Sequence, residues 1–466
     1  MSDNNFDLAV VGAGSAGFSA AITAAELDAR VVLIGHGTIG GTCVNVGCVP
    51  SKTMIRAAEE LHNARVLSRF AGLNGEADID GWGALVAQKD DLVSSLRSAK
   101  YADVLPAYKN ISYHQGVAHC LPEGIAVDGQ TLTAKKVILA TGARAHIPDI
   151  PGIDGVEYLT STTALELQTL PTSMIVLGAG YIGVELAQMF SRMGVEVSLV
   201  CRSRLLPGAE PEISAALTDV FCDEGINVIT GVQYRRVAQS LQGVELVIDH
   251  DGQTRSIVAD KTLVATGRRP NSEDLNLKDI GVETDPSGGI VIDANLRTDN
   301  ANFYAVGDVT GRDMFVYMAA YGGRIAAENA INGADHIYDA STMPAVTFCD
   351  PQVASVGLTE ATARAAGLDV VTSLLPLEHV PRALATRDTR GLIKLVAKRD
   401  GALIGAHMMA AGAGDAIQTA ALAICHGMTP AELGQTIFPY LTMVEGLKLA
   451  AQTFDKDVTK LSCCAG

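Results

Sequence analysis

The chain has 466 residues, of which 48% are hydrophobic and 19% are charged, and its formal net charge at pH 7 is -17. This composition is typical of a compact globular protein of roughly three domains, and the acidic balance makes nucleic acids and anionic membranes poor partners. No apolar stretch reaches the roughly eighteen residues of a membrane helix, and residues 1–6 are too polar for a signal peptide. The nine cysteines are an odd, scattered set, which does not suit a secreted disulfide framework, so we expect a cytoplasmic protein.

The first recognisable pattern is a glycine-rich turn near the start of the chain. An apolar strand is predicted over 6–11 and a helix over 18–27, and the turn between them reads Gly12-Ala13-Gly14-Ser15-Ala16-Gly17. A G-x-G-x-x-G turn in this context lets the backbone approach a pyrophosphate at the helix N-terminus. Gly12, Gly14 and Gly17 are therefore predicted to bind a dinucleotide.

One position departs from the dinucleotide-binding pattern. An acidic residue usually follows the second strand of such a unit and binds the adenosine ribose. Here the strand predicted over 31–34 is followed by Gly35. Either another group holds the ribose or the cofactor binds less tightly.

A pair of cysteines follows the first unit. Cys43 and Cys48 lie in a stretch that reads Gly40-Gly41-Thr42-Cys43-Val44-Asn45-Val46-Gly47-Cys48-Val49-Pro50-Ser51-Lys52, ahead of a helical run over 53–66. If one helix begins near Cys43, a spacing of five residues places both sulfurs roughly on one face. A helix N-terminus also stabilises a thiolate. The spacing alone predicts a redox disulfide, two buried structural cysteines or a metal-binding pair.

A second strand–turn–helix unit begins at Met174. Its turn reads Gly178-Ala179-Gly180-Tyr181-Ile182-Gly183, and its second strand is predicted over 196–200. Two such units imply two nucleotide cofactors. No acid follows the second strand, whereas Arg202 and Arg204 do, and arginines suit a 2′-phosphate. We therefore expect NADPH rather than NADH, unless both arginines simply face solvent.

Three further segments carry candidate residues. The strand 137–142 ends in Ala-Thr-Gly, with Thr141 and Gly142 in the turn, and the segment Leu263–Gly267 repeats this ending. Asp308 follows an apolar strand at the position where ligands of α/β sheets bind, although it could be a solvated turn residue. A helix predicted over 94–105 contains Tyr101, which either packs or faces the site.

The composition changes from Pro344 onward. Strands are predicted over 346–348 and 353–357, a hairpin over 391–396 and 402–406, and helices over 415–427 and 445–454. This order indicates an α+β domain. His407 and His426 are expected to pack rather than to catalyse.

Taken together, the cysteine stretch, the two glycine turns and the Gly307-Asp308 ending resemble the pyridine nucleotide-disulfide oxidoreductases over nearly the whole chain. The resemblance implies an α/β fold with two Rossmann-like dinucleotide-binding domains, for FAD and NADPH, and a C-terminal α+β dimerisation domain. The expected domains are an FAD-binding domain with a redox disulfide (1–148), an NADPH-binding domain (149–268), a segment completing the FAD domain (269–340) and a dimerisation domain (341–466).

The resemblance also implies roles for single residues. Cys48 would lie against the flavin and Cys43 would meet the substrate, while Lys52 would lie near the flavin and pair with Glu185. The residues expected at FAD are Gly12, Gly14, Gly17, Gly41, Thr42, Lys52, Thr141, Gly142 and Asp308. Those expected at NADPH are Gly178, Gly180, Gly183, Arg202 and Arg204.

The segment 438–445 departs from the members of this family that reduce disulfides. Those members carry a His–Glu pair in a segment resembling H-x-H-P-T-x-S-E, and the histidine protonates the leaving thiolate. Here Glu445 keeps its place, but Tyr440 stands where the histidine is expected. A phenol with a pKa near 10 is a poor acid–base group at neutral pH, whereas an imidazole near 6.5 suits the task. The chain keeps the residues for electron transfer and lacks this proton donor.

A metal ion accepts two electrons without needing a proton. Hg(II), reduced to Hg(0), is such a substrate, and this soft ion prefers thiolates. The chain ends with Cys463-Cys464-Ala465-Gly466, a pair that could take Hg(II) from small thiols and pass it to Cys43 and Cys48, or that could be incidental.

Tyr440, Tyr101 and the terminal cysteines together resemble a metal-reducing branch of the family. That resemblance implies a homodimer in which the tail and Tyr440 of one subunit complete the cysteine site of the other. We expect no N-terminal C-x-x-C metal-binding domain of the kind that many members of the branch carry.

Two other functions remain open. A disulfide reductase with a C-terminal dithiol shuttle would resemble the large thioredoxin reductases, but those keep the His–Glu pair that Tyr440 replaces. A metal-sequestering protein with a vestigial flavin site would not need the intact motifs at Gly12, Gly178 and Asp308.

Overall fold

The structure, a computed structural model, describes residues 5–458. The chain divides into two compact units, each assembled from three separate segments. The first unit comprises Met1–Thr53, Gly83–His146 and Gly267–Ala340, and the second comprises Met54–Trp82, Ile147–Thr266 and Ser341–Gly466. Within the described range, no helix combines the length and apolarity needed to cross a lipid bilayer.

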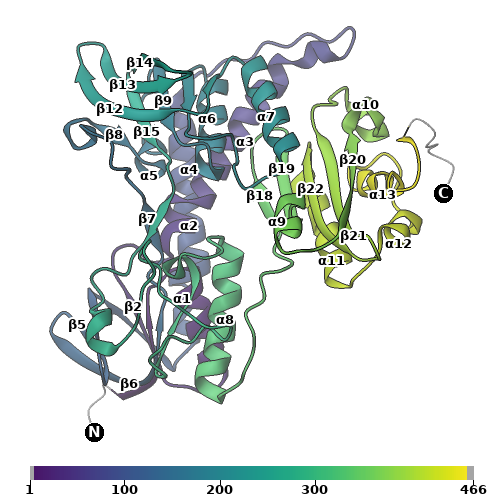
Figure 1. The fold of residues 1–466 in the computed structure, drawn as a ribbon. Helices are drawn as coiled ribbons and strands as arrows, with labels where there is room; N and C mark the ends of the chain where they lie inside the picture. Colours follow the sequence, from purple (N-terminus) through teal and green to yellow (C-terminus); the bar gives the residue numbers. More distant parts are fainter. Residues whose placement is uncertain (1–4, 459–466) are drawn as a thin grey trace. The chain divides into compact units, whose positions relative to one another are not determined.

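The first unit is built on one seven-stranded sheet (Figure 1). Its parallel core has the order β3-β2-β1-β6. The strand β17 pairs in parallel with Val137–Leu139, the last residues of β6, on the side away from β1. The strands are β1 (Asn5–Val11), β2 (Val31–Gly35), β3 (Ile111–Gln115), β4 (Ala118–Leu121), β5 (Gly124–Val127), β6 (Gln130–Leu139) and β17 (Phe303–Ala305). These parallel pairings confirm the predicted α/β architecture for this unit. The strands β1, β2 and β17 are apolar because strands of a parallel sheet are buried on both faces.

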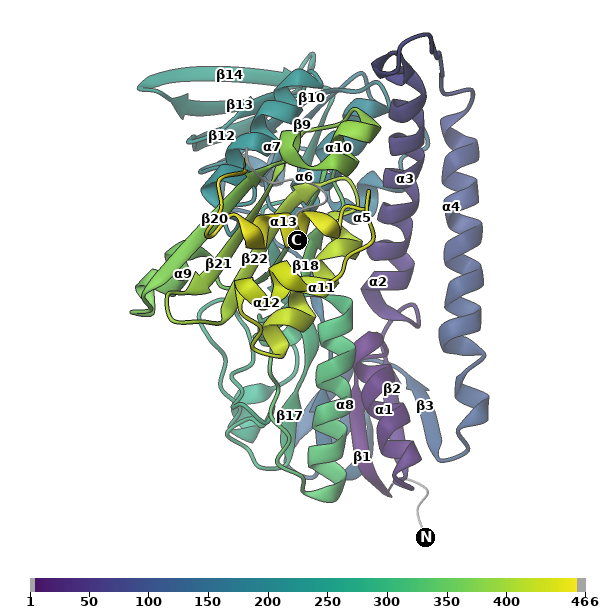
Figure 2. The same ribbon diagram turned by 90° about the vertical axis from the view of Figure 1, so that its right-hand side faces the viewer.

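Two helices of the first unit, α1 (Ser15–Glu26) and α8 (Val316–Asn332), lie side by side against this sheet, as Figure 2 shows. Their backbones approach closely, because a Cβ at Gly323 would lie only 2.3 Å from the carbonyl oxygen of Ala16. The N-terminus of α1 lies at the carboxyl edge of the sheet because only three residues separate it from the end of β1.

The second unit contains a second parallel sheet, with the order β11-β10-β9-β15-β8. Its elements are β8 (Tyr158–Leu159), β9 (Ser173–Leu177), α6 (Tyr181–Arg192), β10 (Glu196–Val200), α7 (Pro211–Asp223), β11 (Asn227–Ile229) and β15 (Lys261–Val264). An antiparallel ribbon follows β11 and consists of β12 (Gln233–Ser240), β13 (Gly243–His250) and β14 (Gln253–Ala259). The predicted second strand–turn–helix unit is therefore confirmed.

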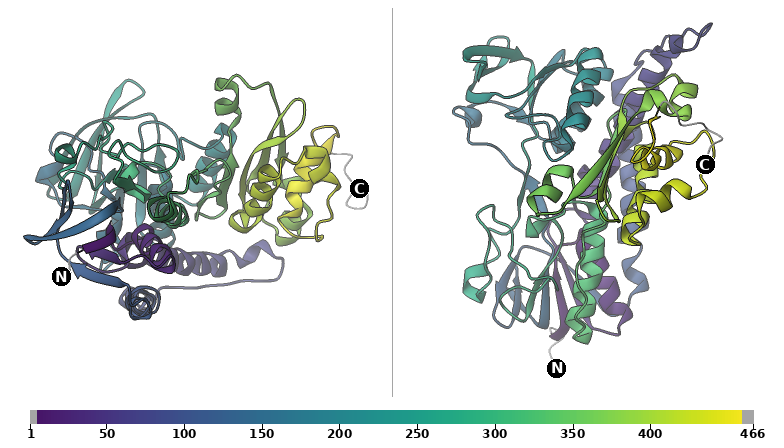
Figure 3. Two further views of the ribbon diagram at one scale, coloured as in Figure 1. Left: turned by 90° about the horizontal axis from the view of Figure 1, so that it is seen from below. Right: turned by 45° about the vertical axis from the view of Figure 1, so that its right-hand side comes forward.

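The C-terminal part of the second unit is an antiparallel sheet with the order β18-β19-β22-β21-β20. Its strands are β18 (Ala345–Thr347), β19 (Gln352–Gly357), β20 (Val370–Pro376), β21 (Leu392–Lys398) and β22 (Leu403–Ala410). The helices α11 (Ala413–Cys425), α12 (Pro430–Gln435) and α13 (Glu445–Gln452) gather on one face of the sheet, as Figure 3 shows. The α+β expectation is confirmed, including the hairpin, while β20 was not predicted.

Shorter elements join these sheets. They are α5 (Ser161–Ala164), α9 (Glu360–Ala365), α10 (Pro381–Thr386), β7 (Ala143–Ala145), β16 (Arg268–Pro270) and the short helices η1 (Leu67–Arg69), η3 (Leu105–Ala107), η4 (Ile153–Gly155), η5 (Leu277–Ile280), η6 (Gly307–Thr310) and η7 (Leu377–His379).

Two predicted helices differ in the structure. The cysteine stretch is not one helix from Cys43: α2 (Gly41–Val46) ends at Gly47, whose φ of -119° and ψ of -110° are not helical, and α3 (Cys48–Arg65) starts afresh. The helix expected over 94–105 is instead the end of α4 (Trp82–Arg97) followed by a wider π-helical turn, η2 (Ser98–Ala102). The helical periodicity was right in both places, but the breaks depend on the local backbone.

Candidate active site

The first glycine turn forms a cradle that fits a dinucleotide. A Cβ at Gly12 would lie 2.1 Å from the carbonyl oxygen of Ala140, and one at Gly17 would lie 1.7 Å from the carbonyl oxygen of Gly12. Gly14 caps α1 with extended backbone, so the helix N-terminus is open toward the turn. Only glycine permits these approaches, and the exposed amides suit a pyrophosphate.

The second glycine turn repeats this geometry in the second unit. A Cβ at Gly178 would lie 2.5 Å from the carbonyl oxygen of Ala265, and one at Gly183 would lie 1.9 Å from that of Gly178. Gly180 caps α6 with extended backbone, as Gly14 caps α1. The two turns fit two separate dinucleotides, as the sequence predicted.

The cysteine stretch lies directly on the first glycine turn. Gly41 has a φ of +66°, and a Cβ there would lie 2.6 Å from the Cα of Gly14. The Gly40 amide donates to the carbonyl of Ala13 at 2.8 Å. Gly41 and Thr42 therefore begin α2 beside the place predicted for the cofactor pyrophosphate.

A polar clamp holds α2 in this position. The Asn45 Nδ2 donates to the carbonyls of Ile39 and Gly41, each at 2.9 Å. The Arg97 Nη1 donates to the Asn45 Oδ1 at 3.2 Å. Sequence reasoning missed both side chains, because nothing in the local pattern connects positions 45 and 97.

Cys43 and Cys48 meet as two thiols across the break at Gly47. Both are half-buried and neither is in a disulfide in this structure. The pKa of Cys43 is raised well above its usual value, first by its hydrogen bond to Cys48 and then by burial, while the charge of Lys52 opposes the shift. A proton held on Cys43 and shared with Cys48 lets the pair carry one negative charge, the form of a reduced redox pair.

Tyr101 lies close enough to the cysteine pair to be affected by its charge. Its hydroxyl lies 3.1 Å from the Ser15 Oγ, and its ring packs edge-on against Phe18 with the centroids 4.8 Å apart. Burial raises the pKa of the Tyr101 phenol, and the charges of Cys43 and Cys48 raise it further. The phenol therefore stays protonated.

The remaining flavin candidates of the first unit stand at the carboxyl ends of its strands. Asp308 lies in η6, directly after β17, and burial raises the pKa of its carboxyl although the Arg268 Nε lies 3.6 Å from it. The Thr141 Oγ1 donates to the carbonyl of Asn271 at 2.6 Å. Gly142 follows with a φ of +71°. These residues end β17 and β6, which are neighbouring parallel strands.

Lys52 and Glu185 fall into different units, so their predicted ion pair remains a prediction. Glu185 lies on α6 and is 5% exposed. Its Oε1 accepts a hydrogen bond from the amide of Phe348 at 2.8 Å. The carboxylate is thus held within the second unit by the segment that follows β18.

The two arginines after β10 differ in their surroundings. Arg202 is exposed. The Arg204 Nη2 donates to the carbonyls of Pro207 at 3.0 Å and of Ala209 at 2.7 Å. Arg204 therefore fixes its own loop, and Arg202 is the freer of the two to meet a 2′-phosphate.

The carboxylate of Glu445 holds the turn around Tyr440 in place. The Glu445 Oε2 accepts a hydrogen bond from the amide of Leu441 at 3.1 Å, and Leu441 has a φ of +63°. Glu445 is 6% exposed, whereas Tyr440 is 56% exposed. The buried carboxylate fixes a turn that presents the phenol.

The metal ligands expected at the end of the chain lie outside the described residues, since Cys463 and Cys464 follow position 458. Among residues 5–458, no group of three or more His, Cys, Asp or Glu side chains is arranged to hold a metal ion. A two-sulfur site at Cys43 and Cys48 is the arrangement that the described residues offer to a soft ion.

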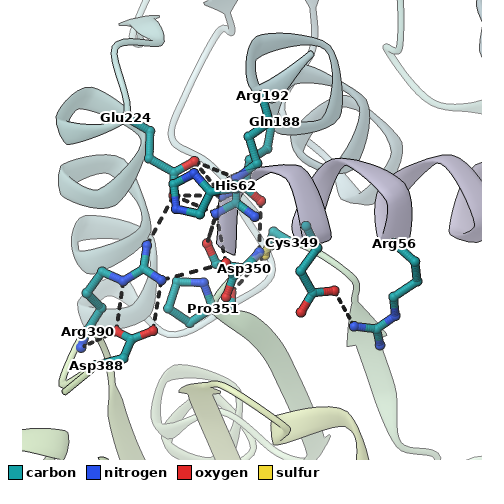
Figure 4. Close-up of polar contacts among 11 residues, drawn as sticks. Arg56, His62, Gln188, Arg192, Glu224, Cys349, Asp350, Pro351, Asp388 and Arg390 are labelled. Atoms are coloured by element: carbon teal, nitrogen blue, oxygen red, sulfur yellow. Dashed lines mark hydrogen bonds and ion pairs between the residues drawn. The ribbon is translucent and has the colours of Figure 1, made fainter. Parts of the chain in front are cut away.

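A buried charge network in the second unit was not found from the sequence (Figure 4). The Arg192 Nη2 contacts the Glu224 Oε1 at 2.7 Å and the Asp350 Oδ2 at 2.8 Å. The Arg390 Nη1 contacts the same Glu224 atom at 3.1 Å, and the Gln188 Nε2 donates to the carbonyl of Asp350 at 2.7 Å. This network joins α6 and the residue that follows α7 to the turn between β18 and β19 and to the segment just before β21.

Comparisons with known proteins identify the family of this chain. Residues 6–323 match the family described as "Pyridine nucleotide-disulphide oxidoreductase", and residues 343–451 match its dimerisation domain. The HOCl-induced flavoprotein disulfide reductase RclA of Escherichia coli aligns with a TM-score of 0.84 and 28% identity, covering 96% of this chain and 99% of that one.

Curated relatives are closer in sequence. A mercuric reductase of Staphylococcus aureus is 48% identical over 100% of this chain and 85% of its own length. One of Streptomyces lividans is 47% identical over 99% of this chain and 98% of its own length. The chain therefore belongs to the pyridine nucleotide-disulphide oxidoreductase family, within the branch of the mercuric reductases.

Proposed function

We propose that this chain is an NADPH-dependent flavoenzyme that reduces Hg(II) to Hg(0) and so detoxifies mercury. The observation that carries the proposal is the turn at Tyr440. The position of the expected acid–base histidine holds a phenol that is 56% exposed, and Glu445 bonds the amide of Leu441 at 3.1 Å. No imidazole is present there for Glu445 to orient. The turn suits a substrate that needs electrons and no proton.

The chemistry balances without a proton donor to substrate. NADPH and Hg(II) give NADP⁺, a proton and Hg(0), so that the metal is reduced by two electrons while the cysteine sulfurs that release it stay thiolates. FAD, when bound, supplies the transfer of the electron pair between NADPH and the cysteine site. Cys43 and Cys48 provide the soft ligands that Hg(II) prefers, and Tyr101 donates a hydrogen bond beside them.

The two glycine turns support a proposal for the residues that bind each cofactor. Gly12, Gly14, Gly17, Gly41 and Thr42 would hold the FAD pyrophosphate, with Asp308, Thr141 and Gly142 at the strand ends nearby. Gly178, Gly180 and Gly183, together with Arg202, would hold NADPH. Lys52 and Glu185 would pair close to the flavin, where the ion pair would keep the lysine charged despite burial.

The assembly we propose is a cytoplasmic homodimer. The dimerisation domain at residues 343–451 supports the pairing of two copies. In this proposal Tyr440 and the Cys463-Cys464 tail of one subunit complete the cysteine site of the other, and the tail takes Hg(II) from small-thiol complexes. The proposed domains are 1–148 with 269–340 for FAD, 149–268 for NADPH and 341–466 for dimerisation.

The first test is NADPH oxidation by the full-length enzyme with excess small thiol, with and without Hg(II). We expect mercury-dependent oxidation with release of volatile mercury. Parallel assays offer oxidised glutathione and thioredoxin, because the RclA structures belong to a disulfide reductase. Oxidation that requires a disulfide and ignores Hg(II) would overturn the proposal in favour of a disulfide reductase.

The tail has its own test. The double variant Cys463→Ala/Cys464→Ala should lose turnover with bulky mercury–dithiol complexes and keep NADPH reduction of the Cys43–Cys48 pair. The exposed Cys222 offers a matched control, Cys222→Ala, which should behave as the unaltered enzyme. Full turnover of the tail variant with bulky complexes would remove the transfer step from the mechanism.

A further inference from the structure

The end of β2 is where the acid that usually binds the adenosine ribose is missing. Gly35 is buried there, and a Cβ built on it would lie 2.6 Å from the Tyr113 Oη and 2.8 Å from the Ala13 Cβ. A side chain at position 35 would thus begin in space that the tyrosine hydroxyl already occupies. The glycine and the tyrosine are sterically matched to each other.

Strand register explains how Tyr113 reaches this place. β3 runs parallel to β2, with Leu33 opposite Tyr113 and Gly35 opposite Gln115. Side chains two residues apart share a face of a sheet, so the ring of Tyr113 stands on the face of positions 33 and 35. Its hydroxyl extends along the strand to the carboxyl end of β2.

The same spot borders the first glycine turn. The Gly12 amide donates to the carbonyl of Ile34 at 2.8 Å, and Ala13 lies inside the turn beside Gly35. In a dinucleotide-binding unit the ribose lies between the glycine turn and the end of the second strand. The Tyr113 hydroxyl therefore faces the ribose end of the cradle.

The hydroxyl is available for a ligand. Among residues 5–458 it makes no hydrogen bond, although a phenol normally finds a partner when its ring is packed. Burial raises the pKa of Tyr113, so the group stays a neutral O–H. A neutral phenol both donates and accepts, which suits the hydroxyls of a ribose.

We propose that the Tyr113 hydroxyl replaces the missing acid and hydrogen-bonds the adenosine ribose of FAD. Of the two possibilities that Gly35 leaves open, a substitute ligand and a weakened site, the geometry favours the substitute. The proposal concerns cofactor binding and does not depend on which substrate the cysteine pair reduces.

The test compares FAD with FMN, which lacks the adenosine. The full-length holoenzyme carrying Tyr113→Phe is diluted, and the release of FAD is followed by the rise in flavin fluorescence. A second sample, exchanged into FMN, is treated identically. Loss of one neutral hydrogen bond should speed FAD release about three- to tenfold, whereas FMN release should not change. The phenylalanine keeps the ring, so the packing around it is retained.

The control is Tyr108→Phe, which removes a hydroxyl that bonds the Glu26 Oε1 at 3.2 Å on the surface of the same unit. It should leave both release rates unchanged. Equal acceleration of FAD and FMN release by Tyr113→Phe would show a packing role and overturn the proposal. So would an unchanged FAD rate together with faster FAD release from His36→Ala, since His36 follows Gly35 directly.

Discussion

The Tyr101 hydroxyl lies 3.1 Å from the Ser15 Oγ, although 86 positions separate the two residues. Ser15 is the first residue of α1 and belongs to the glycine turn, while Tyr101 stands beside the cysteine pair. One hydrogen bond thus ties the cofactor cradle to the place where substrate would meet Cys43.

Tyr101→Phe should slow the chemistry at the cysteines without affecting their reduction. The variant loses an O–H that stays protonated because burial raises its pKa. A hydrogen bond to a charged sulfur contributes about 1.5–3 kcal/mol, so kcat with Hg(II)–thiol complexes should fall about tenfold or more. Stopped-flow reduction of the enzyme by NADPH should be unchanged. An unchanged kcat would leave Tyr101 with a packing role only.

Gly41→Ala should loosen the flavin. The substitution adds a Cβ that would lie 2.6 Å from the Cα of Gly14, and backbone atoms cannot yield as a flexible side chain can. Gly37→Ala is the matched control, because its φ of +79° carries the same conformational strain but nothing lies within 4 Å of the new Cβ. Flavin content after dialysis should fall for Gly41→Ala and stay near that of the unaltered protein for Gly37→Ala.

Arg192→Met should destabilise the second unit strongly. The substitution leaves the carboxylates of Glu224 and Asp350 buried with one arginine, Arg390, between them. Breaking a buried ion pair costs about 3–5 kcal/mol. Arg236→Met breaks an exposed pair with Glu245 and should cost no more than about 1 kcal/mol. Midpoints of urea unfolding measure both, and equal shifts would contradict the difference in burial.

The stability of the fold should decrease as the pH falls below about 6.5. Burial lowers the pKa of His62 and of His407, so the unfolded chain binds more protons than the folded chain in this range. His62 lies 3.9 Å from the Glu224 Oε1 within the charge network of Figure 4. Stability is therefore complete above the unfolded pKa and is lost on acidification.

His62→Gln should flatten this dependence. The variant's melting temperature should change less between pH 7.5 and pH 5.5 than that of the unaltered protein, because one of these two imidazoles no longer titrates. His426→Gln, at an exposed position, is the control and should keep the full slope. A slope that His62→Gln leaves unchanged would assign the acid sensitivity to other groups.

Much of the fold follows from local sequence pattern. The glycine spacing at Gly12–Gly17 and the apolar strands around it predict a strand–turn–helix unit, because each feature acts within a dozen residues. The same holds for the second unit at Gly178 and for the hairpin of β21 and β22. The break between α2 and α3 could not be predicted in this way. The helical periodicity of the sequence continues across Gly47, whereas the backbone there is not helical, with a ψ of -110°.

Candidate reactive residues could be proposed from the sequence, but the side chains that support them could not. Cys43, Cys48 and Tyr101 are recognisable as residue types at particular spacings. Asn45 and Arg97 were not found, since their bond at 3.2 Å depends on how α4 packs on the cysteine stretch. Arg204 shows a second gap: its charge suggests a phosphate ligand, and the sequence does not reveal that its Nη2 also bonds two carbonyls of its own loop.

The strand β17 has a consequence for how the protein is made. Phe303 pairs with Val137, so the first unit closes its sheet with a strand that the ribosome delivers more than a hundred residues after β6. The inserted segment Ile147–Thr266 emerges entirely before that strand. Domains generally fold as units while the chain is being synthesised. Until β17 has been synthesised, the first unit therefore cannot complete its sheet, and the edge of β6 that pairs with β17 stays exposed. A chain interrupted between residues 266 and 303 would carry both glycine turns and still expose the unpaired edge of β6.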